Sequence, residues 1–123
     1  MPLLNDRVVL VSGGTSGLGA AIARAAAREG ALVAVTGRRR EPGEALAAEL
    51  VAAGTKALFV QADIADTEQA RACVTATVAG FGRVDSLVNA AGLTSRGTLL
   101  DTTPELFDAH IAVNLKEIGR AHV

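Results

Sequence analysis

The stretch from Arg7 to Gly19, RVVLVSGGTSGLG, decides the fold of this chain. It opens with an unbroken apolar run, Val8 to Val11, which is typical of a central strand buried on both faces of a parallel sheet. Four glycines interleaved with serine and threonine follow, and an alanine-rich segment with apolar residues at helical spacing begins at Leu18. The sequence therefore predicts a strand, a tight turn and a helix in immediate succession.

The glycine-rich turn predicts a binding site for a dinucleotide phosphate. Glycines let the backbone turn sharply and let its N–H groups approach a phosphate with no Cβ in the way, and the start of the following helix adds a partial positive charge. An ATP-type phosphate loop is excluded because no Gly-Lys-Ser/Thr follows. A purely structural turn is the alternative. The candidate cofactor-binding residues in this stretch are Ser12, Gly13, Thr15, Ser16, Gly17, Leu18 and Gly19.

Beyond this stretch, short β-branched runs alternate with alanine-rich stretches, which is the βαβα pattern of a parallel sheet covered by helices. The expected strands are Arg7–Ser12, Leu32–Thr36, Lys56–Gln61 and Val84–Ala90. The expected helices are Leu18–Glu29, Pro42–Ala53, one from Asp66 or Thr67 to about Gly80, and one opening near Pro104. Helical spacing assigns to the inward faces Leu18, Ile22, Ala25 and Ala26, then Ala45, Leu46, Leu50 and Ala53, then Ala70, Cys73, Val74, Thr77 and Phe81. One layered α/β domain is expected.

The composition narrows the function classes. The chain has 123 residues, 50% of them hydrophobic, and 12 basic against 13 acidic side chains give a formal net charge of -1. That balance argues against a disordered chain and offers no electrostatic footprint for nucleic acid. Cys73 is the single cysteine, His110 has no metal ligand at suitable spacing, and no apolar run reaches the roughly 18 residues of a membrane span. We expect a cytoplasmic protein without a metal site, a nucleic-acid partner or a membrane partner.

The end of the second strand predicts which dinucleotide binds. A site for NAD carries an acidic residue about 20 positions after the glycine turn, which binds the ribose 2′-hydroxyl and repels a 2′-phosphate. Gly37 occupies that place, and Arg38, Arg39 and Arg40 follow. Since a guanidinium can pair bidentately with a phosphate, we predict NADP as the cofactor, with NAD as the other candidate. Arg38 is the first choice for the 2′-phosphate contact and Arg39 the second; a solvated basic turn is the alternative.

With these motifs the chain resembles the short-chain dehydrogenase/reductase family. That family carries Thr-Gly-x-x-x-Gly-x-Gly after its first strand, and Ser12 to Gly19 matches this motif with a leading serine. Asp63-Ile64-Ala65-Asp66 resembles the family's acidic turn, whose first aspartate contacts the adenine. Asn89-Ala90-Ala91-Gly92 resembles its Asn-Asn-Ala-Gly motif, with alanine in place of the second asparagine. Asn114 falls where the family keeps a helix asparagine that supports a proton-relay water.

The resemblance carries implications for fold and site residues. It implies a Rossmann-type doubly wound parallel sheet with the strand order 3-2-1-4, truncated because the family's later strands would follow. It implies a catalytic role for Asn114. The further cofactor-binding residues that it implies are Asp63, Ile64, Asn89, Ala90 and Gly92.

The family's reaction is hydride transfer between a nicotinamide and a carbonyl or alcohol substrate. A tyrosine acts as general acid/base, a lysine four residues later lowers its pKa, and a serine orients the substrate oxygen. This chain contains no tyrosine, and its only lysines are Lys56 and Lys116. Family members are roughly twice this length, as their six- or seven-stranded sheet requires. The resemblance therefore implies the N-terminal, cofactor-binding half of an NADP-dependent oxidoreductase, inactive by itself and forming a homodimer or homotetramer when complete.

Two alternatives remain at this point. Residues 1–116 are expected to form the half-domain. The segment from Glu117 to Val123 can be encoded by GAG-ATC-GGA-AGA-GCA-CAC-GTC, which reads as a sequencing adapter translated in frame. Residues 117–123 are therefore expected to be non-native. An ordinary divergent tail is the other interpretation. For function, the alternative is a genuinely short, non-catalytic nucleotide-binding or regulatory module. A methyltransferase of the same fold would want an acidic residue where Gly37 stands.

Overall fold

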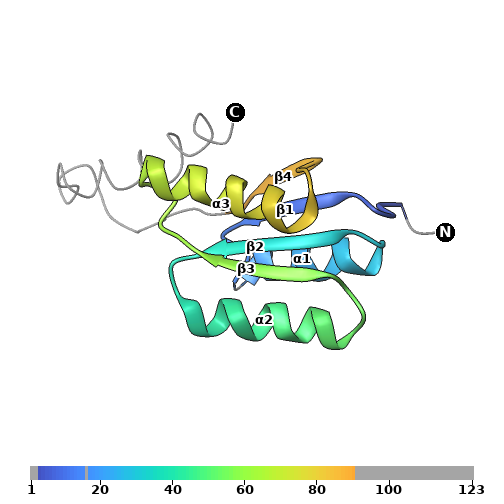
Figure 1. The fold of residues 1–123 in the computed structure, drawn as a ribbon. Helices are drawn as coiled ribbons and strands as arrows, with labels where there is room; N and C mark the ends of the chain where they lie inside the picture. Colours follow the sequence, from blue (N-terminus) through green and yellow to red (C-terminus); the bar gives the residue numbers. More distant parts are fainter. Residues whose placement is uncertain (1–2, 16, 91–123) are drawn as a thin grey trace, which may run out of the picture.

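The computed structural model describes residues 3–15 and 17–90, and there a four-stranded parallel sheet alternates with helices along the chain (Figure 1). The elements are β1 (Val8–Ser12), α1 (Gly17–Arg28), β2 (Leu32–Gly37), α2 (Arg40–Ala52), β3 (Ala57–Gln61), α3 (Thr67–Phe81) and β4 (Ser86–Asn89). The strands lie in the order β3-β2-β1-β4. The predicted α/β class and the strand order 3-2-1-4 are thus confirmed. The helix expected near Pro104 and the segment 117–123 lie outside the described residues.

The helices cover both faces of the sheet. Leu58 and Phe59 are neighbours in β3, and successive strand residues point to opposite faces. A Cβ added at Gly43 of α2 would overlap the Phe59 ring, whereas one added at Gly80 of α3 would lie 2.7 Å from Leu58 Cδ2. The helices α2 and α3 therefore pack on opposite faces, and α1, which contacts α2, shares its side of the sheet (Figure 1). This is the doubly wound arrangement.

The largest core cluster lies between the sheet and the layer formed by α1 and α2. Every residue of β1 is buried, which confirms it as a central strand. The buried residues of the cluster are Val9, Val11, Ala20, Ala23, Ala26, Ala31, Val33, Val35, Leu46 and Leu50. On the other face Cys73 is buried, with its Sγ 3.2 Å from Thr36 Oγ1 and its carbonyl accepting a 2.8 Å hydrogen bond from Thr77 Oγ1. Cys73 is a packing residue of α3.

Three helix-face predictions are wrong in detail. Leu18 is 72% exposed, and Ala45 and Ala53 are also exposed. In alanine-rich helices small apolar residues surround the axis, so that spacing alone does not select one face. The face that packs on the sheet in α1 is instead the one with the smallest side chains, which include Gly19 and Ala20.

Most element boundaries differ from expectation by at most one residue, but the starts of α2 and β4 differ by two. Helix α2 begins at Arg40 rather than at Pro42, because the first N–H groups of a helix have no intrahelical partner and proline is tolerated there. Strand β4 begins at Ser86 rather than at Val84, because the Val8 N–H bonds the Asp85 side chain, at 2.8 Å to Oδ2, in place of a backbone carbonyl. The cap of α3 is Asp66, whose Oδ1 accepts from two backbone N–H groups of the first turn.

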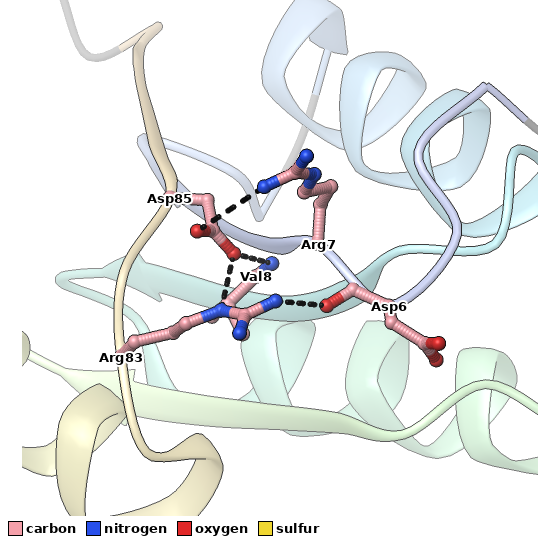
Figure 2. A network of polar contacts seen from close by, with 5 residues as sticks. All are labelled: Asp6, Arg7, Val8, Arg83 and Asp85. Atoms are coloured by element: carbon pink, nitrogen blue, oxygen red, sulfur yellow. Dashed lines mark hydrogen bonds and ion pairs between the residues drawn. The ribbon is translucent and has the colours of Figure 1, made fainter.

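The amino edge of the sheet is held together by a polar network around Asp85 (Figure 2). Besides the Val8 N–H, Asp85 Oδ2 accepts a 2.8 Å hydrogen bond from Arg83 Nε, and Arg7 Nη1 lies 3.9 Å from Oδ1. Arg83 Nη2 also donates to the Asp6 carbonyl at 2.8 Å. The Val8 hydrogen bond, and after it the Arg83 side chain, hold the pKa of Asp85 below its usual value. The network ties the segment before β1 to the segment before β4.

Candidate cofactor-binding site

The predicted site residues that the structure describes gather at the carboxyl edge of the sheet. In register, Ser12 pairs with Thr36 on one side and with Asn89 on the other, and Gly37 pairs with Gln61. The Ala90 N–H continues the β1–β4 pairing with a 2.9 Å bond to the Ser12 carbonyl. Ser16, Gly92 and Asn114 lie outside the described residues. Ligands of open α/β sheets bind at this edge, beside the point where strand order reverses.

The glycine turn needs its glycines for two physical reasons. Gly13 and Gly17 have positive φ values of 73° and 57°, in the left-handed region that favours glycine. A Cβ at Gly19 would overlap the Gly13 carbonyl oxygen and lie 2.9 Å from Gly14 Cα. The first turn of α1 is therefore pressed directly against the backbone of the loop before it, and only glycine allows this approach.

The backbone donors of this turn fall into two groups. The N–H groups of Gly13 and Gly14 both donate to the Thr36 carbonyl, at 3.0 and 3.2 Å, so they brace the turn against the end of β2. The N–H groups at the start of α1, from Gly17 to Gly19, have no acceptor within the helix. Gly17 and Leu18 are exposed. The helix start, rather than Gly13 and Gly14, therefore supplies the donors that an anion could use.

The three arginines between β2 and α2 have different surroundings. Arg40 is engaged: its Nε and Nη2 lie 3.3 and 3.1 Å from Gln61 Oε1, and its Nη1 lies 3.8 Å from Glu44 Oε1. The side chains of Arg38 and Arg39 are exposed, and neither has a hydrogen-bond or ion-pair partner within residues 3–15 and 17–90. Among the described residues, two guanidinium groups at this edge are therefore not engaged by the fold.

Gly37 packs directly against the glycine turn. A Cβ added there would lie 2.6 Å from Thr15 Cγ2 and 3.1 Å from Thr15 Oγ1. A carboxylate at position 37, which would bind a ribose hydroxyl, does not fit while Thr15 keeps this position. Steric packing and charge therefore agree in keeping the end of β2 free of an acidic side chain.

The acidic turn after β3 is ordered by its own hydrogen bonds. Asp63 Oδ1 accepts from the Ala65 N–H at 3.0 Å, and the Asp63 N–H donates to Gln69 Oε1 at 2.7 Å. The Ala62 N–H donates to the Gly37 carbonyl at 2.9 Å, which fixes the turn beside the end of β2. Asp63 and Ile64 are both half-buried. One carboxylate oxygen thus has a structural role, and the other is what Asp63 could present to a ligand.

The sequence prediction missed two residues of this edge, Thr36 and Gln61. Thr36 accepts both glycine-turn N–H groups through its carbonyl and is buried, and Gln61 holds the Arg38–Arg40 turn by its side chain. The available signal was a polar residue at the end of each apolar strand. That pattern does not distinguish a residue that orders a site from one that simply meets solvent.

No metal centre or membrane span emerges from the part of the chain that the structure describes. Within residues 3–15 and 17–90, no three side chains of His, Cys, Asp or Glu gather into a group that could hold a metal ion. None of the helices described is long and apolar enough to cross a membrane. A hollow of about 450 Å³ opens at the amino edge, where Val8, Leu32 and Lys56 are among its lining residues. It lies at the end of the sheet opposite to the predicted site.

Comparison with known proteins agrees with this geometry. The family model described as short chain dehydrogenase matches residues 7–119. An uncharacterized oxidoreductase of Methylorubrum extorquens is 40% identical over 116 residues, which are 94% of this chain and 47% of that protein. Versicolorin reductase 1 of Aspergillus parasiticus is 40% identical over 114 residues, 92% of this chain and 44% of that protein.

A solved structure of a short chain dehydrogenase from Burkholderia cenocepacia in complex with NADP superposes with a TM-score of 0.92 at 39% identity. The match covers 96% of this chain and 49% of that one. This chain therefore belongs to the short-chain dehydrogenase family of oxidoreductases. It spans about half the length of the relatives that it matches.

Proposed function

We propose that residues 1–116 are the cofactor-binding portion of an NADP-dependent short-chain dehydrogenase/reductase, which transfers hydride between a nicotinamide and a carbonyl or alcohol substrate. The observation that carries the proposal is the pairing of two features at one edge. The donors at the start of α1 stand beside a turn whose Arg38 and Arg39 have no partner among the described residues.

The residues present fit a dinucleotide. A Cβ at Gly19 would overlap the backbone of the glycine turn, so α1 packs against this turn as closely as the third glycine of a dinucleotide-binding fingerprint requires. A helix start favours negative charge, and a guanidinium favours a phosphate over a hydroxyl. The NADP bound by the Burkholderia cenocepacia relative supports the same choice of cofactor.

Each part of the edge then has a role. The first turn of α1 would hold the pyrophosphate, Arg38 with Arg39 the 2′-phosphate, and Asp63 with Ile64 the adenine. The bound nicotinamide supplies the hydride donor or acceptor. Asn114 would support a proton-relay water. The other residues that would border the cofactor are Ser12, Gly13, Thr15, Ser16, Asn89, Ala90 and Gly92.

These 123 residues should give no turnover by themselves. The proton donor of the family is a tyrosine, and this chain contains none. The proposal therefore places the catalytic tyrosine, lysine and serine outside the chain. NADPH oxidation by the 123-residue chain with a carbonyl substrate would contradict that placement. The cytoplasmic location and the homodimer or homotetramer stay predictions.

Arg38→Ala in the complete protein tests the cofactor assignment. Removing the guanidinium should weaken NADPH binding by about 1–3 kcal/mol, the scale of a lost charge-assisted hydrogen bond, and leave NADH binding unchanged. Titration of each cofactor measures the two dissociation constants. Arg28→Ala is the matched control, because it removes the same charge from the last turn of α1. Equal losses for NADPH and NADH would show that Arg38 does not read the 2′-phosphate.

The alternative is a genuinely short, non-catalytic nucleotide-binding or regulatory module, which the lack of tyrosine fits equally well. Sequencing the DNA downstream of this region separates the two. An in-frame serine followed by Tyr-x-x-x-Lys supports the dehydrogenase, and a stop codon directly after codon 123 supports the module. The same sequence tests the proposal that residues 117–123 derive from an adapter, since their codons in genuine genomic DNA would refute it.

A further inference from the structure

The connection between β2 and α2 has no cap of its own. Only Arg38 and Arg39 separate the end of β2 at Gly37 from the start of α2 at Arg40. The N-cap residue, Arg39, has extended backbone (φ -100°, ψ 120°), and its side chain makes no capping hydrogen bond. A capping side chain therefore does not hold this short turn, and a contact from another element can take that role.

The side chain of Gln61 fills that role. Gln61 is the last residue of β3 and pairs in register with Gly37, so its side chain lies beside the turn. Its Nε2 donates to the Arg38 carbonyl at 3.1 Å, and its Oε1 accepts from Arg40 Nη2 at 3.1 Å and from Arg40 Nε at 3.3 Å. One amide thus bridges the first and the third arginine of the turn.

The Gln61 amide satisfies both contacts. The Arg38 carbonyl can only accept and the Arg40 guanidinium can only donate, so the group between them needs a donor and an acceptor side by side. A carboxylate would place an oxygen against the Arg38 carbonyl, and an aliphatic side chain would bond neither. The chemistry of the two partners also fixes which end of the Gln61 amide is the nitrogen.

The hydrogen bonds of Gln61 give Arg38 and Arg40 different roles. Arg40 is bound to Gln61 and Glu44 and is occupied as a structural residue. The hydrogen bond from Gln61 to the Arg38 carbonyl fixes the backbone of Arg38. The exposed Arg38 side chain has no partner within the described residues. A side chain on backbone that is already fixed has less conformational freedom to lose when it binds a phosphate.

We propose that Gln61 is a positioning residue for cofactor selectivity: it holds the Arg38 carbonyl and so presents Arg38 to a 2′-phosphate-bearing dinucleotide. This inference rests on the proposed function, since it needs Arg38 to read that phosphate. It predicts that substitution of Gln61 weakens the binding of NADPH and not that of NADH.

A double-mutant cycle in the complete protein tests the proposal. Dissociation constants for NADPH and NADH are measured by titration for the parent protein, Gln61→Met, Arg38→Ala and the double variant. Methionine keeps the length of the side chain and loses both hydrogen bonds. Gln61→Met should weaken NADPH binding about 3- to 10-fold, the scale of a lost neutral hydrogen bond, and leave NADH binding unchanged. In the Arg38→Ala background, Gln61→Met should change NADPH binding no further.

Retained NADH binding also shows that each variant is folded. Arg40→Met is the second variant, because it breaks the other half of the bridge and leaves the Gln61–Arg38 bond in place; it should weaken NADPH binding less than Gln61→Met. Equal losses of NADPH and NADH in Gln61→Met, or additive effects with Arg38→Ala, overturn the proposal. Arg38→Ala without effect on NADPH overturns the proposed cofactor assignment and this inference with it.

Discussion

The two edges of the sheet are built in opposite ways. At the amino edge, Asp85 receives a backbone N–H and two arginine side chains, and Arg83 reaches on to the Asp6 carbonyl (Figure 2). At the carboxyl edge, the glycine turn is braced from backbone to backbone, by the bonds of Gly13 and Gly14 to the Thr36 carbonyl. The exposed side chains of Arg38 and Arg39 have no partner there among the described residues.

This contrast separates stability from binding. The charged side chains at the amino edge are bound to one another and to backbone groups of the same chain, so they can stabilise the fold but offer little to a ligand. At the carboxyl edge, backbone hydrogen bonds and the Gln61 amide hold the segments that carry the arginine side chains and the first N–H groups of α1. These groups can therefore bind an anion. Substitutions at the two edges should therefore change different measurements.

The largest effect is expected from Gly19→Val. The new side chain would overlap the Gly13 carbonyl, so the loop and α1 must move apart, and both cofactor binding and stability should suffer. We expect a loss at or above the upper end of the usual range of about 1–3 kcal/mol for overpacking. NADPH titration and thermal unfolding measure the two losses. Ala21→Val, at an exposed position of the same helix, should lower stability by only about 0.5 kcal/mol. Unchanged NADPH affinity in Gly19→Val would show that the loop is a structural turn that does not bind the cofactor.

A second effect is expected at Gly37. Gly37→Asp should weaken NADPH binding through repulsion of the phosphate, but it should not give tight NADH binding, because the new Cβ lies 2.6 Å from Thr15 Cγ2. That clash should destabilise the site by about 1–3 kcal/mol. Adding Thr15→Gly removes the clashing atoms and should raise the NADH affinity of Gly37→Asp. The cofactor titrations check this, with Thr15→Gly alone as the control. Tight NADH binding by the single variant would show that the Thr15 contact does not limit selectivity.

Asp85→Asn, at the amino edge, should change the stability of the fold and not the binding of the cofactor. It should lower the thermal unfolding temperature near pH 7 and leave both cofactor affinities unchanged. The pKa of Asp85 is lowered in the folded chain, so its charge contributes stability above the unfolded carboxyl pKa of about 3.9, and that contribution is lost as the pH falls through the lower folded value. The difference between parent and variant should therefore shrink on acidification from neutral pH to about pH 3. A difference that stays constant with pH would mean that the charge of Asp85 is not what stabilises the edge.

The smallest effect is expected from Glu49→Gln on the outer surface. Arg24 Nε donates to Glu49 Oε2 at 2.7 Å and joins α1 to α2, which lowers the pKa of Glu49 and raises that of Arg24. Both side chains are exposed, and water screens such a pair, so the unfolding temperature should change little and the change should vanish at high salt. Thermal unfolding at two salt concentrations measures it. If Glu49→Gln lowers the unfolding temperature as much as Asp85→Asn, the edge network does not stabilise the fold more than an exposed surface pair.

The sequence by itself determined the order of elements and the class of fold. Apolar runs such as Val8–Val11, separated by helical stretches and glycine turns, leave a covered parallel sheet as the arrangement that buries them. The motif Ser12 to Gly19 located the loop at the right edge, because spacing along one strand–turn–helix unit is a local property. Helix faces were predicted less well, as Leu18 and Ala45 show, because alanine lies on every side of these helices.

Only the tertiary structure decided how the carboxyl edge is assembled. Gln61 is about two dozen residues from the Arg38 that it holds, Thr36 braces the glycines of the turn after β1, and Thr15 fills the space beside Gly37. Hydrogen bonds and steric contacts of this kind depend on strand order and register. No local spacing encodes which of three adjacent arginines is bound and which remain exposed, because that choice is made by a side chain from the neighbouring strand.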